Sequence, residues 1–149
     1  MRWRNVPKYR TASEEETIAL GERLAGELPR RGVVLLIGNL GAGKTTLAKG
    51  IAHGRGAAGH DEVSSPTFTL IHEYGARVYH IDLYRLDEAR QVATLGLDEL
   101  FDRDALVMIE WGERFPELMP RERTEIYLRA CGDDEREIEV REVKNASRR

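Results

Sequence analysis

Hydrophobic positions recur at helical spacing behind a capping motif near the N-terminus. Residues 13–16 read Ser-Glu-Glu-Glu, the S-x-x-E pattern of a capping box, and apolar residues follow at positions 18, 20, 24, 25 and 28. We therefore predict a helix over about residues 13–28. Pro29 and Gly32 end this helix, and the apolar run at residues 33–37 is typical of a strand that is buried on both faces of a parallel sheet.

The apolar run leads into a glycine-rich segment and then into a second predicted helix. Residues 45–53 are good helix formers with cationic residues in the last turn, and the glycines that follow break the helix. Residues 68–74 and 77–84 both have the composition of strands, and only the pair Gly75-Ala76 separates them, which predicts a hairpin. An otherwise parallel sheet would thus gain antiparallel strands.

The second half of the chain repeats the pattern of helix and buried strand. Residues 87–101 are predicted to be helical with a break at Gly96, and residues 105–109 form a second buried strand that ends at Glu110. Two further short strands, residues 125–129 and 138–143, are joined by a polar turn at residues 132–134.

Size and charge narrow the class of protein. A chain of 149 residues fits one domain, and 41% hydrophobic with 33% charged residues is ordinary for a globular protein. The net charge of -3 argues against the broad basic surface that direct nucleic-acid binding needs. There is one cysteine, Cys131, the first ten residues lack the apolar stretch of a signal peptide, and no apolar run could span a bilayer. We expect a cytoplasmic protein without disulfides or membrane contact.

The glycine-rich segment carries the clearest chemical signal. Residues 38–45 read Gly-Asn-Leu-Gly-Ala-Gly-Lys-Thr and match the P-loop pattern G-x-x-x-x-G-K-[ST] in full. Glycines let successive backbone N–H groups turn toward a phosphate, and the following helix points its positive end at the same anion. Lys44 supplies a point charge for the β- and γ-phosphates, and the Thr45 hydroxyl is a hard oxygen ligand for Mg²⁺. The alternative is a glycine-rich turn with an incidental lysine, but the preceding strand and the following helix are the context that the motif requires.

The P-loop determines the expected fold and ligand. We predict an α/β, P-loop NTPase-like fold of three layers, with a mostly parallel central sheet that antiparallel strands extend. A single P-loop ATPase domain is expected over residues 1–143, followed by a flexible polar tail over residues 144–149. ATP is the favoured nucleotide because the N-K-x-D segment of guanine-specific P-loop proteins does not occur in the sequence.

Two carboxylates are candidates for binding Mg²⁺ or for orienting water beside the P-loop. Glu110 follows a buried strand, where P-loop proteins usually place an acid that helps to hold Mg²⁺. Asp82 shares one face of a predicted strand with His80 and Tyr84, and could orient water toward the γ-phosphate or hold Mg²⁺ through a water. A solvated strand end for Glu110 and a structural hydrogen-bond network for Asp82 are the alternatives. Trp111, next to Glu110, is more often a core residue than a ligand-stacking one.

Two other features allow more than one interpretation. The four histidines, at positions 53, 60, 72 and 80, fit neither a zinc finger nor H-E-x-x-H, so we assign no transition metal to them and interpret them as surface or core residues. Ser65-Pro66-Thr67-Phe68 places hydroxyls beside a rigid proline, which suits either a segment that senses the γ-phosphate or an ordinary turn.

Taken together, several segments resemble the TsaE (YjeE) family, the bacterial ATPases of tRNA threonylcarbamoyladenosine (t6A) biosynthesis. They are residues 38–46, Ser65-Pro66-Thr67-Phe68, His80-Ile81-Asp82-Leu83-Tyr84-Arg85, Leu95-Gly96-Leu97-Asp98 and Glu110-Trp111, in that order along the chain. The resemblance covers about residues 11–116. Residues 55–62 are longer and richer in Gly and His than is usual for the family, and the turn at residues 75–76 is shorter.

The resemblance implies a set of site residues and partners. It implies that Thr45 and Glu110 hold Mg²⁺, that Asp82 is essential, and that Trp111 lies close to the nucleotide. By the same resemblance the start of the first helix and an acid after Glu110-Trp111 approach the nucleotide. The resulting site contains, for catalysis, Lys44, Asp82 and Glu110; for ATP, Gly38, Asn39, Leu40, Gly41, Ala42, Gly43, Lys44, Thr45, Thr46, Trp111, Ala12, Glu14 and Glu113; and for Mg²⁺, Thr45, Glu110 and Asp82. The family acts with two proteins, TsaB and TsaD, so contact with tRNA is expected only through the complex.

Two other functions use the same loop. A small-molecule kinase would need an acceptor pocket and a cationic lid, for which Arg121-Glu122-Arg123 is the only candidate in the sequence. A nucleotide-gated binding module with little turnover would use residues 65–68 to change its affinity for a partner.

Overall fold

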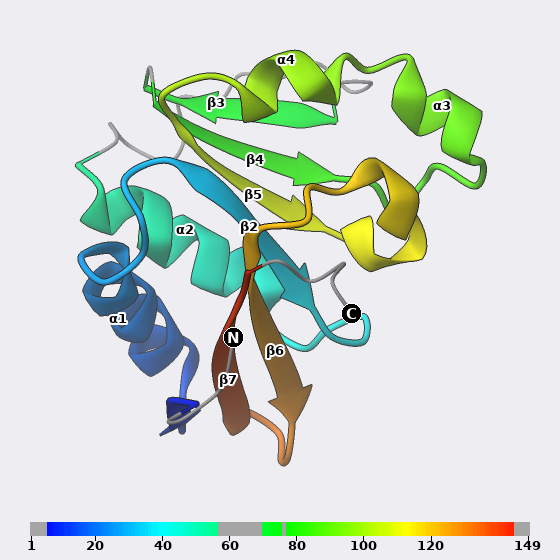
Figure 1. Ribbon diagram of the computed structural model, residues 1–149. Coiled ribbons are helices and arrows are strands. Elements are labelled where there is room, and N and C mark those ends of the chain that lie inside the picture. Colours follow the sequence, from blue (N-terminus) through cyan, green and yellow to red (C-terminus); the bar gives the residue numbers. More distant parts are fainter. Residues whose placement is uncertain (1–5, 57–69, 76, 145–149) are drawn as a thin grey trace.

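A seven-stranded sheet forms the middle layer of the protein (Figure 1). The computed structural model describes residues 6–56, 70–75 and 77–144. Its strands are β1 (Lys8–Thr11), β2 (Gly32–Ile37), β3 (Ile71–Tyr74), β4 (Val78–Asp82), β5 (Leu106–Glu110), β6 (Arg123–Ala130) and β7 (Arg136–Val143). Its helices are α1 (Glu14–Ala25), α2 (Lys44–Gly54), α3 (Ala89–Ala93) and α4 (Leu97–Phe101), with short 3₁₀ turns η1 (Gly112–Arg114) and η2 (Pro116–Leu118).

The strand order is β1-β7-β6-β2-β5-β4-β3. The four central strands are parallel to one another, since β2 pairs in parallel with both β6 and β5, and β5 pairs in parallel with β4. Antiparallel strands extend this centre on both sides, β3 beside β4 and β7 with β1 beside β6. The predicted P-loop NTPase-like sheet, mostly parallel at its centre and antiparallel at its edges, is confirmed.

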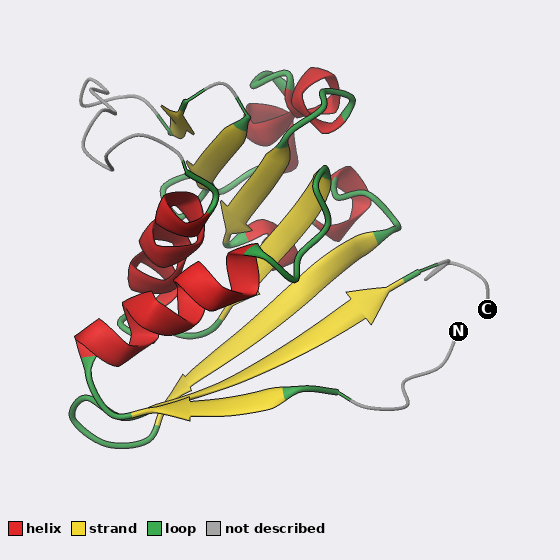
Figure 2. Cartoon of the chain, turned by 90° about the vertical axis from the view of Figure 1, so that its left-hand side faces the viewer, coloured by secondary structure: helices red, strands yellow, loops and turns green. Residues whose placement is uncertain are grey.

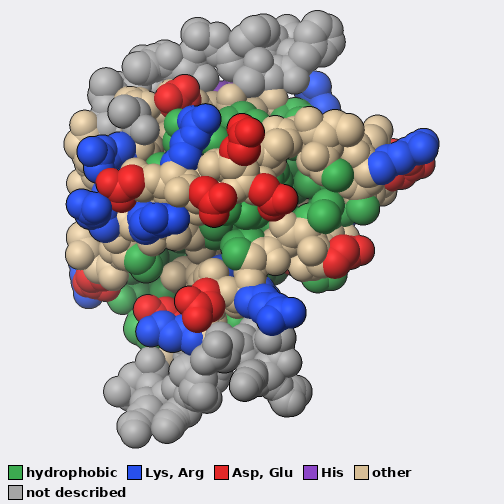
Figure 3. Space-filling view, turned by 45° about the horizontal axis from the view of Figure 1, so that its top comes forward, with side chains coloured by type: hydrophobic (Ala, Val, Ile, Leu, Met, Phe, Trp, Pro, Cys, Tyr) green, Lys and Arg blue, Asp and Glu red, His purple; other side chains and the backbone are tan. Residues whose placement is uncertain are grey.

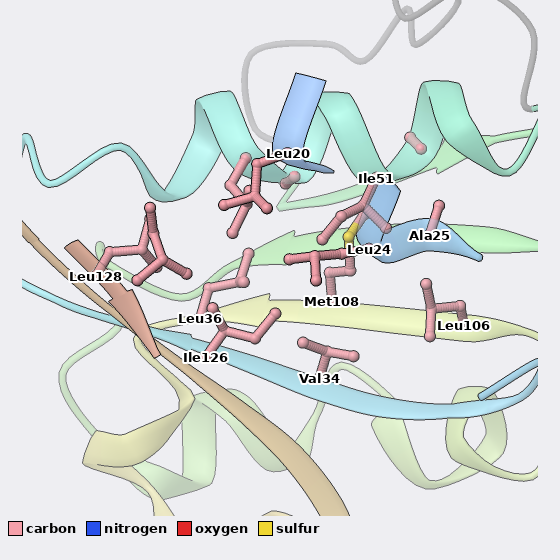
Figure 4. Close-up of a cluster of buried hydrophobic side chains, with 14 of the residues drawn as sticks. Leu20, Leu24, Ala25, Val34, Leu36, Ile51, Leu106, Met108, Ile126 and Leu128 are labelled. Atoms are coloured by element: carbon pink, nitrogen blue, oxygen red, sulfur yellow. The ribbon is translucent and has the colours of Figure 1, made fainter. Parts of the chain in front are cut away.

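Helices cover the two faces of the sheet and complete the three predicted layers (Figures 1 and 2). α1 and α2 pack together on one face and enclose a core of leucine, isoleucine and methionine side chains from both helices and the central strands (Figure 4). α3, α4 and the 3₁₀ turns enclose a second core on the opposite face. α1 and α2 approach very closely, because a Cβ built at Gly50 would lie 2.3 Å from the Ile18 carbonyl oxygen. This contact places the N-terminal end of α1 beside the P-loop.

Several elements differ from the predictions at their ends. α1 begins after Ser13, whose hydroxyl accepts from the Glu16 N–H at 3.1 Å as a capping box requires, but it ends at Ala25, three residues early, with Gly26 as the C-cap. The predicted helix over residues 87–101 consists of α3 and α4, separated at Gly96, which has φ +74. β4 ends at Asp82 rather than at residue 84, because the chain turns there, with the Tyr84 N–H donating to Asp82 Oδ1 and the Leu86 N–H to the Leu83 carbonyl oxygen. The edge strand β1 and both 3₁₀ turns were not predicted.

Some predictions fall on residues that the structure does not describe. Ser65-Pro66-Thr67-Phe68, His60 and Ala76 of the predicted hairpin turn lie outside the described residues. β3 and β4 nevertheless pair antiparallel on either side of that turn, with Tyr74 opposite Val78. The division into a domain of residues 1–143 and a tail of residues 144–149 stays a prediction, since only residue 144 of that tail is described. In the described part of the chain, every helix is too short or too polar to cross a membrane.

Candidate functional site

The P-loop joins the end of β2 to the start of α2. Gly41 and Gly43 have φ values of +82 and +103, which residues other than glycine rarely adopt. Gly43 is the N-cap of α2 and provides no capping side chain. Since the first N–H groups of an α-helix have no acceptor within the helix, the start of α2 offers backbone donors and the positive end of the helix dipole to an anion.

A cavity of about 400 Å³, which we call the P-loop cavity, opens beside this loop. Ten residues of the predicted site line it: Glu14, Leu40, Gly41, Gly43, Lys44, Thr45, Thr46, Asp82, Glu110 and Trp111. Four lining residues were not in that set: Thr17, Tyr84, Asp134 and Arg136. Thr17 could have been found from the sequence, because it lies one helical turn after Glu14.

Five other predicted ATP-site residues do not line the cavity: Ala12, Gly38, Asn39, Ala42 and Glu113. Ala42 is only 3% exposed and belongs to the core beneath α1 and α2. The backbone N–H of Ala12, the residue before the N-cap Ser13, donates to the Glu16 carboxylate at 2.7 Å and so binds the chain to the first turn of α1. Gly38 lies so close to β6 that a Cβ built on it would be 2.5 Å from the Leu128 carbonyl oxygen. Ala42 and Gly38 therefore serve packing, and Ala12 serves the start of α1.

The Lys44 ammonium is buried at the floor of the cavity. Its Nζ donates to the Gly38 carbonyl oxygen at 2.6 Å and lies 3.6 Å from the centroid of the Trp111 ring. Burial lowers the pKa of Lys44 below its ordinary value, and the nearby carboxylates of Glu110 and Glu113 offset part of this effect. A cation in such a weakly hydrated place attracts an anion strongly, because solvent screens it little.

Glu110 connects three elements at the end of β5. Its Oε2 accepts from the Thr45 hydroxyl at 2.8 Å and lies 2.6 Å from His80 Nε2. An ionised carboxylate only accepts hydrogen bonds, so His80 Nε2–H is the donor. Burial by itself would raise the pKa of Glu110, but the hydrogen bonds from His80 and Thr45 outweigh burial and hold the pKa below its ordinary value.

Asp82 lies beside Glu110 in the sheet, since the two residues pair in register at the ends of β4 and β5. Its Oδ1 accepts from the backbone N–H of Tyr84 at 2.9 Å, which fixes the carboxylate at the turn after β4. The hydroxyl of Thr45 and the carboxylates of Glu110 and Asp82 are the hard oxygen donors that Mg²⁺ prefers. In the described part of the chain, no group of three or more His, Cys, Asp or Glu residues forms a metal site by itself. This donor set therefore fits a Mg²⁺ ion that also takes ligands from water and phosphate.

Trp111 has an unusual backbone conformation. It is the one residue other than glycine with positive φ in the described ranges, at φ 70 and ψ 16, and such a conformation costs about 1–3 kcal/mol unless its surroundings enforce it. The guanidinium carbon of Arg114 lies 5.5 Å from the centroid of the Trp111 ring. The Arg114 Nη2 donates to the carbonyl oxygens of Leu83, Tyr84 and Leu86 at 2.8, 3.0 and 2.9 Å. The turn after β4 and the turn after β5 are therefore bound together around the indole.

The charge of Glu113 acts on Lys44, but its carboxylate takes no part in the hydrogen bonds described above. Its Oε1 is buried and has no hydrogen-bond partner among the described residues. Burial raises the pKa of Glu113, and the positive charges of Lys44 and Arg114 oppose this only in part. A carboxylate in this position is an unfavourable feature of the folded chain as it stands.

The histidines have separate environments. His80, predicted as a surface or core residue, is buried and hydrogen-bonded to Glu110. His53 lies 2.6 Å from the Glu22 carboxylate on the exposed sides of α2 and α1. The His72 ring lies 6.2 Å from that of His80. Sequence reasoning placed His80 on the face of Asp82 but did not include it in the site.

Comparison with known proteins places this geometry in a family. Residues 11–138 match the family described as "Threonylcarbamoyl adenosine biosynthesis protein TsaE". The tRNA threonylcarbamoyladenosine biosynthesis protein TsaE of Bacillus subtilis is 43% identical over 93% of this chain and 87% of its own length. The proteins of that name from Haemophilus influenzae and Treponema pallidum are 40% and 38% identical, over 72% and 86% of this chain and 68% and 95% of their own lengths.

A solved structure agrees with the sequence comparisons. The crystal structure of Bacillus subtilis YdiB superposes with a TM-score of 0.76 at 37% identity, over 98% of this chain and 91% of that one. The match in fold therefore extends over nearly the whole chain and includes the strands and loops that form the P-loop cavity. On the family match and on relatives from three bacteria, the chain belongs to the TsaE family of tRNA threonylcarbamoyladenosine biosynthesis proteins.

Proposed function

We propose that the protein binds and hydrolyses ATP with Mg²⁺, and that it supports t6A modification of tRNA in the cytoplasm together with TsaB and TsaD counterparts. The family takes part in t6A biosynthesis; the ATPase activity and the partners are what we add. The observation that carries the proposal is that Lys44, Thr45 and Glu110 meet in one cavity beside a complete P-loop.

The P-loop would bind the phosphates of ATP. Backbone donors at the start of α2 and the Lys44 ammonium face the same cavity, so both can neutralise the β- and γ-phosphates. To reach them, the ammonium would exchange the Gly38 carbonyl for phosphate oxygens. That exchange replaces a neutral acceptor with a charged one and is therefore favourable.

Thr45 and Glu110 would hold Mg²⁺, with Asp82 close enough in the sheet to take part through a water. The bound ion would neutralise charge on the phosphates as the γ-phosphoryl group is transferred. His80 binds the same Glu110 oxygen, Oε2, as Thr45 does and fixes the carboxylate, as residues behind a metal ligand commonly do. Asp82, held by the Tyr84 N–H, is the better placed acid to orient the attacking water, because it is only partly buried whereas Glu110 is buried and binds both Thr45 and His80.

The arginines near the acids support slow hydrolysis by the isolated chain. An arginine that faces the transition-state charge speeds P-loop hydrolysis by roughly 10³ to 10⁵. The guanidinium groups of Arg114 and of Arg136, which lines the cavity, are engaged with backbone carbonyls, and Arg85 is exposed and does not line the cavity. We therefore expect a partner protein to supply what is missing.

Charge distribution also supports indirect contact with tRNA. The chain carries a net charge of -3. On the face seen in Figure 3, several basic side chains lie together on the left with an acidic one among them, acidic side chains lie near the middle, and no basic area extends across the face. Binding of tRNA mainly by the partners agrees with this distribution.

The rival functions gain no support from the described residues. Arg123, part of the segment considered as a kinase lid, belongs to β6 and binds the Glu125 carboxylate at 2.7 Å, away from the P-loop cavity. The segment considered as a nucleotide-gated switch, residues 65–68, lies outside the described residues. The experiment that separates the three functions is product analysis with ATP, which distinguishes free phosphate, a phosphorylated metabolite, and tight binding without turnover.

The role in t6A synthesis has its own test. Phosphate release should be slow for the pure protein and faster with its TsaB and TsaD counterparts, and the reconstituted mixture should modify tRNA over many turnovers only when ATP can bind. Fast hydrolysis that the partners leave unchanged would count against the proposal. Full multiple-turnover modification by a Lys44→Ala protein would do so as well.

A further inference from the structure

The hairpin of β6 and β7 forms one wall of the P-loop cavity. β6 lies beside β2 and runs parallel to it, so the turn that leads into β7 is at the same end of the sheet as the P-loop. Asp134 of this turn and Arg136, the first residue of β7, line the cavity. Nothing in the local sequence pattern indicates this, because it depends on the order of strands in the sheet.

The P-loop packs on this hairpin at two glycines. A Cβ built at Gly38 would lie 2.5 Å from the Leu128 carbonyl oxygen, so the loop leaves β2 in direct contact with the backbone of β6. A Cβ built at Gly43 would lie 3.6 Å from Arg136 Nε. The Arg136 side chain therefore crosses the loop at the N-cap of α2.

The Arg136 guanidinium joins the turn and the loop through backbone carbonyls. Its Nη1 donates to three carbonyl oxygens of the turn, those of Gly132, Asp133 and Glu135, at 3.4, 3.2 and 2.9 Å. Its Nη2 donates to the Gly41 carbonyl oxygen of the P-loop at 3.3 Å. Only a fork of several N–H groups can make contacts in both directions at once.

We infer that Arg136 is a positioning residue of the proposed nucleotide site, one that holds the P-loop in its phosphate-binding shape from the neighbouring hairpin. The inference rests on the proposed function and adds a residue to it. The Gly41 carbonyl oxygen is bound by Arg136, and the Ala42 N–H of the same peptide unit donates to the Asn39 carbonyl oxygen at 3.0 Å, so both polar groups of this peptide are held in place.

The physical reason is the freedom of glycine. Gly41 and Gly43 both have positive φ, and glycine loses more conformational freedom on being fixed than any other residue. If Arg136 fixes Gly41 before ATP arrives, that ordering no longer reduces the affinity for ATP. Removing the guanidinium should weaken ATP binding by about 10-fold, the change expected when one further residue must be ordered on binding.

The test compares Arg136→Ala and Arg136→Lys with Arg129→Ala. Arg129 belongs to the same hairpin and pairs with Glu137 opposite it, but it does not line the P-loop cavity. ATP affinity with Mg²⁺ would be measured by calorimetry on the full chain, with thermal unfolding in the absence of nucleotide as a check on folding. We expect both Arg136 variants to bind about 10-fold more weakly, since lysine keeps the charge but not the fork, and Arg129→Ala to bind as the wild type does.

Kinetics separates positioning from a direct role in the reaction. Steady-state hydrolysis should show a raised KM for ATP with kcat nearly unchanged, because a preformed loop helps the bound substrate and the transition state equally. Amide exchange at Gly41 and Gly43 should be faster in Arg136→Ala without nucleotide. A fall in kcat at constant KM, full affinity in Arg136→Lys, or unchanged affinity in a folded Arg136→Ala would overturn the inference.

The wild type and Lys44→Ala are measured in the same series as controls for the proposed function. Absence of ATP binding by the wild type would overturn the proposed function as well, whereas binding that only Lys44→Ala loses would overturn this inference alone.

Discussion

The hydroxyl of Thr45 donates a hydrogen bond of 2.8 Å to the Glu110 carboxylate, which joins the first turn of α2 to the end of β5 across 65 residues of sequence. The contact forms because β2 and β5 are adjacent parallel strands that end at the same side of the sheet. It brings a hydroxyl and a carboxylate together beside the P-loop. Several consequences of this arrangement can be measured.

Glu110 and Asp82 should fail in different ways when their charges are removed. Glu110→Gln should weaken Mg²⁺-dependent ATP binding by about 10-fold or more, because it loses a charged ligand for the ion. Asp82→Asn should leave binding nearly unchanged and slow hydrolysis by roughly 10²- to 10⁴-fold, the usual effect of losing a group that orients or accepts a proton from water. Calorimetry and phosphate release measure the two properties separately. Equal loss of both properties in both variants would rule out this division of roles.

His80 should stabilise the fold through Glu110. His80→Ala leaves the buried carboxylate one donor short and should lower the free energy of unfolding by about 1–3 kcal/mol. His80→Gln should lose less, because the glutamine amide can reach the place of Nε2.

The exposed pair of His53 and Glu22 provides the matched control for His80. Since surface pairs contribute little, His53→Ala should change the free energy of unfolding by no more than about 0.5 kcal/mol. Urea unfolding at pH 7 measures all three variants. A His80→Ala protein as stable as His53→Ala would show that the buried contact does not contribute.

Glu113 should reduce stability in a pH-dependent way. Its pKa in the folded chain is raised above the ordinary value of 4.5, so the folded state retains a proton that the unfolded state has lost. Its contribution to stability is thus most favourable below pH 4.5 and is lost as the pH rises through the folded-state pKa. Glu113→Gln should be more stable than the wild type at pH 7, and the difference should disappear toward pH 4. A difference that is constant with pH, or that grows on acidification, would contradict this.

Much of the fold could be predicted from the sequence, because the patterns that indicate the central strands and helices are local and agree with one another. The apolar runs before Gly38 and Glu110 identified two central strands, and the P-loop between strand and helix identified the layer arrangement. The same locality explains what was missed. β1 has only four residues and no apolar run, and pairing with β7 alone makes it a strand. The predicted α1 was too long because Gly26 ends it before Pro29 does.

Prediction of the site residues from local sequence patterns has the same limit. Lys44 and Thr45 follow from a motif and Glu110 from a strand end, so each could be proposed without knowing its neighbours. The contact between His80 and Glu110 depends on the pairing of β4 with β5, and the approach of Arg136 to Gly41 depends on the order β7-β6-β2. Strand order is a property of the whole sheet, and no short pattern in the sequence carries it.

The central claim is that the P-loop binds ATP through Lys44, and calorimetric titration of ATP with Mg²⁺ into Lys44→Met tests it most directly. Methionine keeps most of the buried stem beneath Trp111 and removes only the ammonium. Lys49→Met removes the same charge from an exposed position of α2 and is the control. We predict that wild type and Lys49→Met bind alike and that Lys44→Met binds about 10- to 100-fold more weakly. Equal affinity in a folded Lys44→Met protein, or no binding of ATP by the wild type, would contradict the claim.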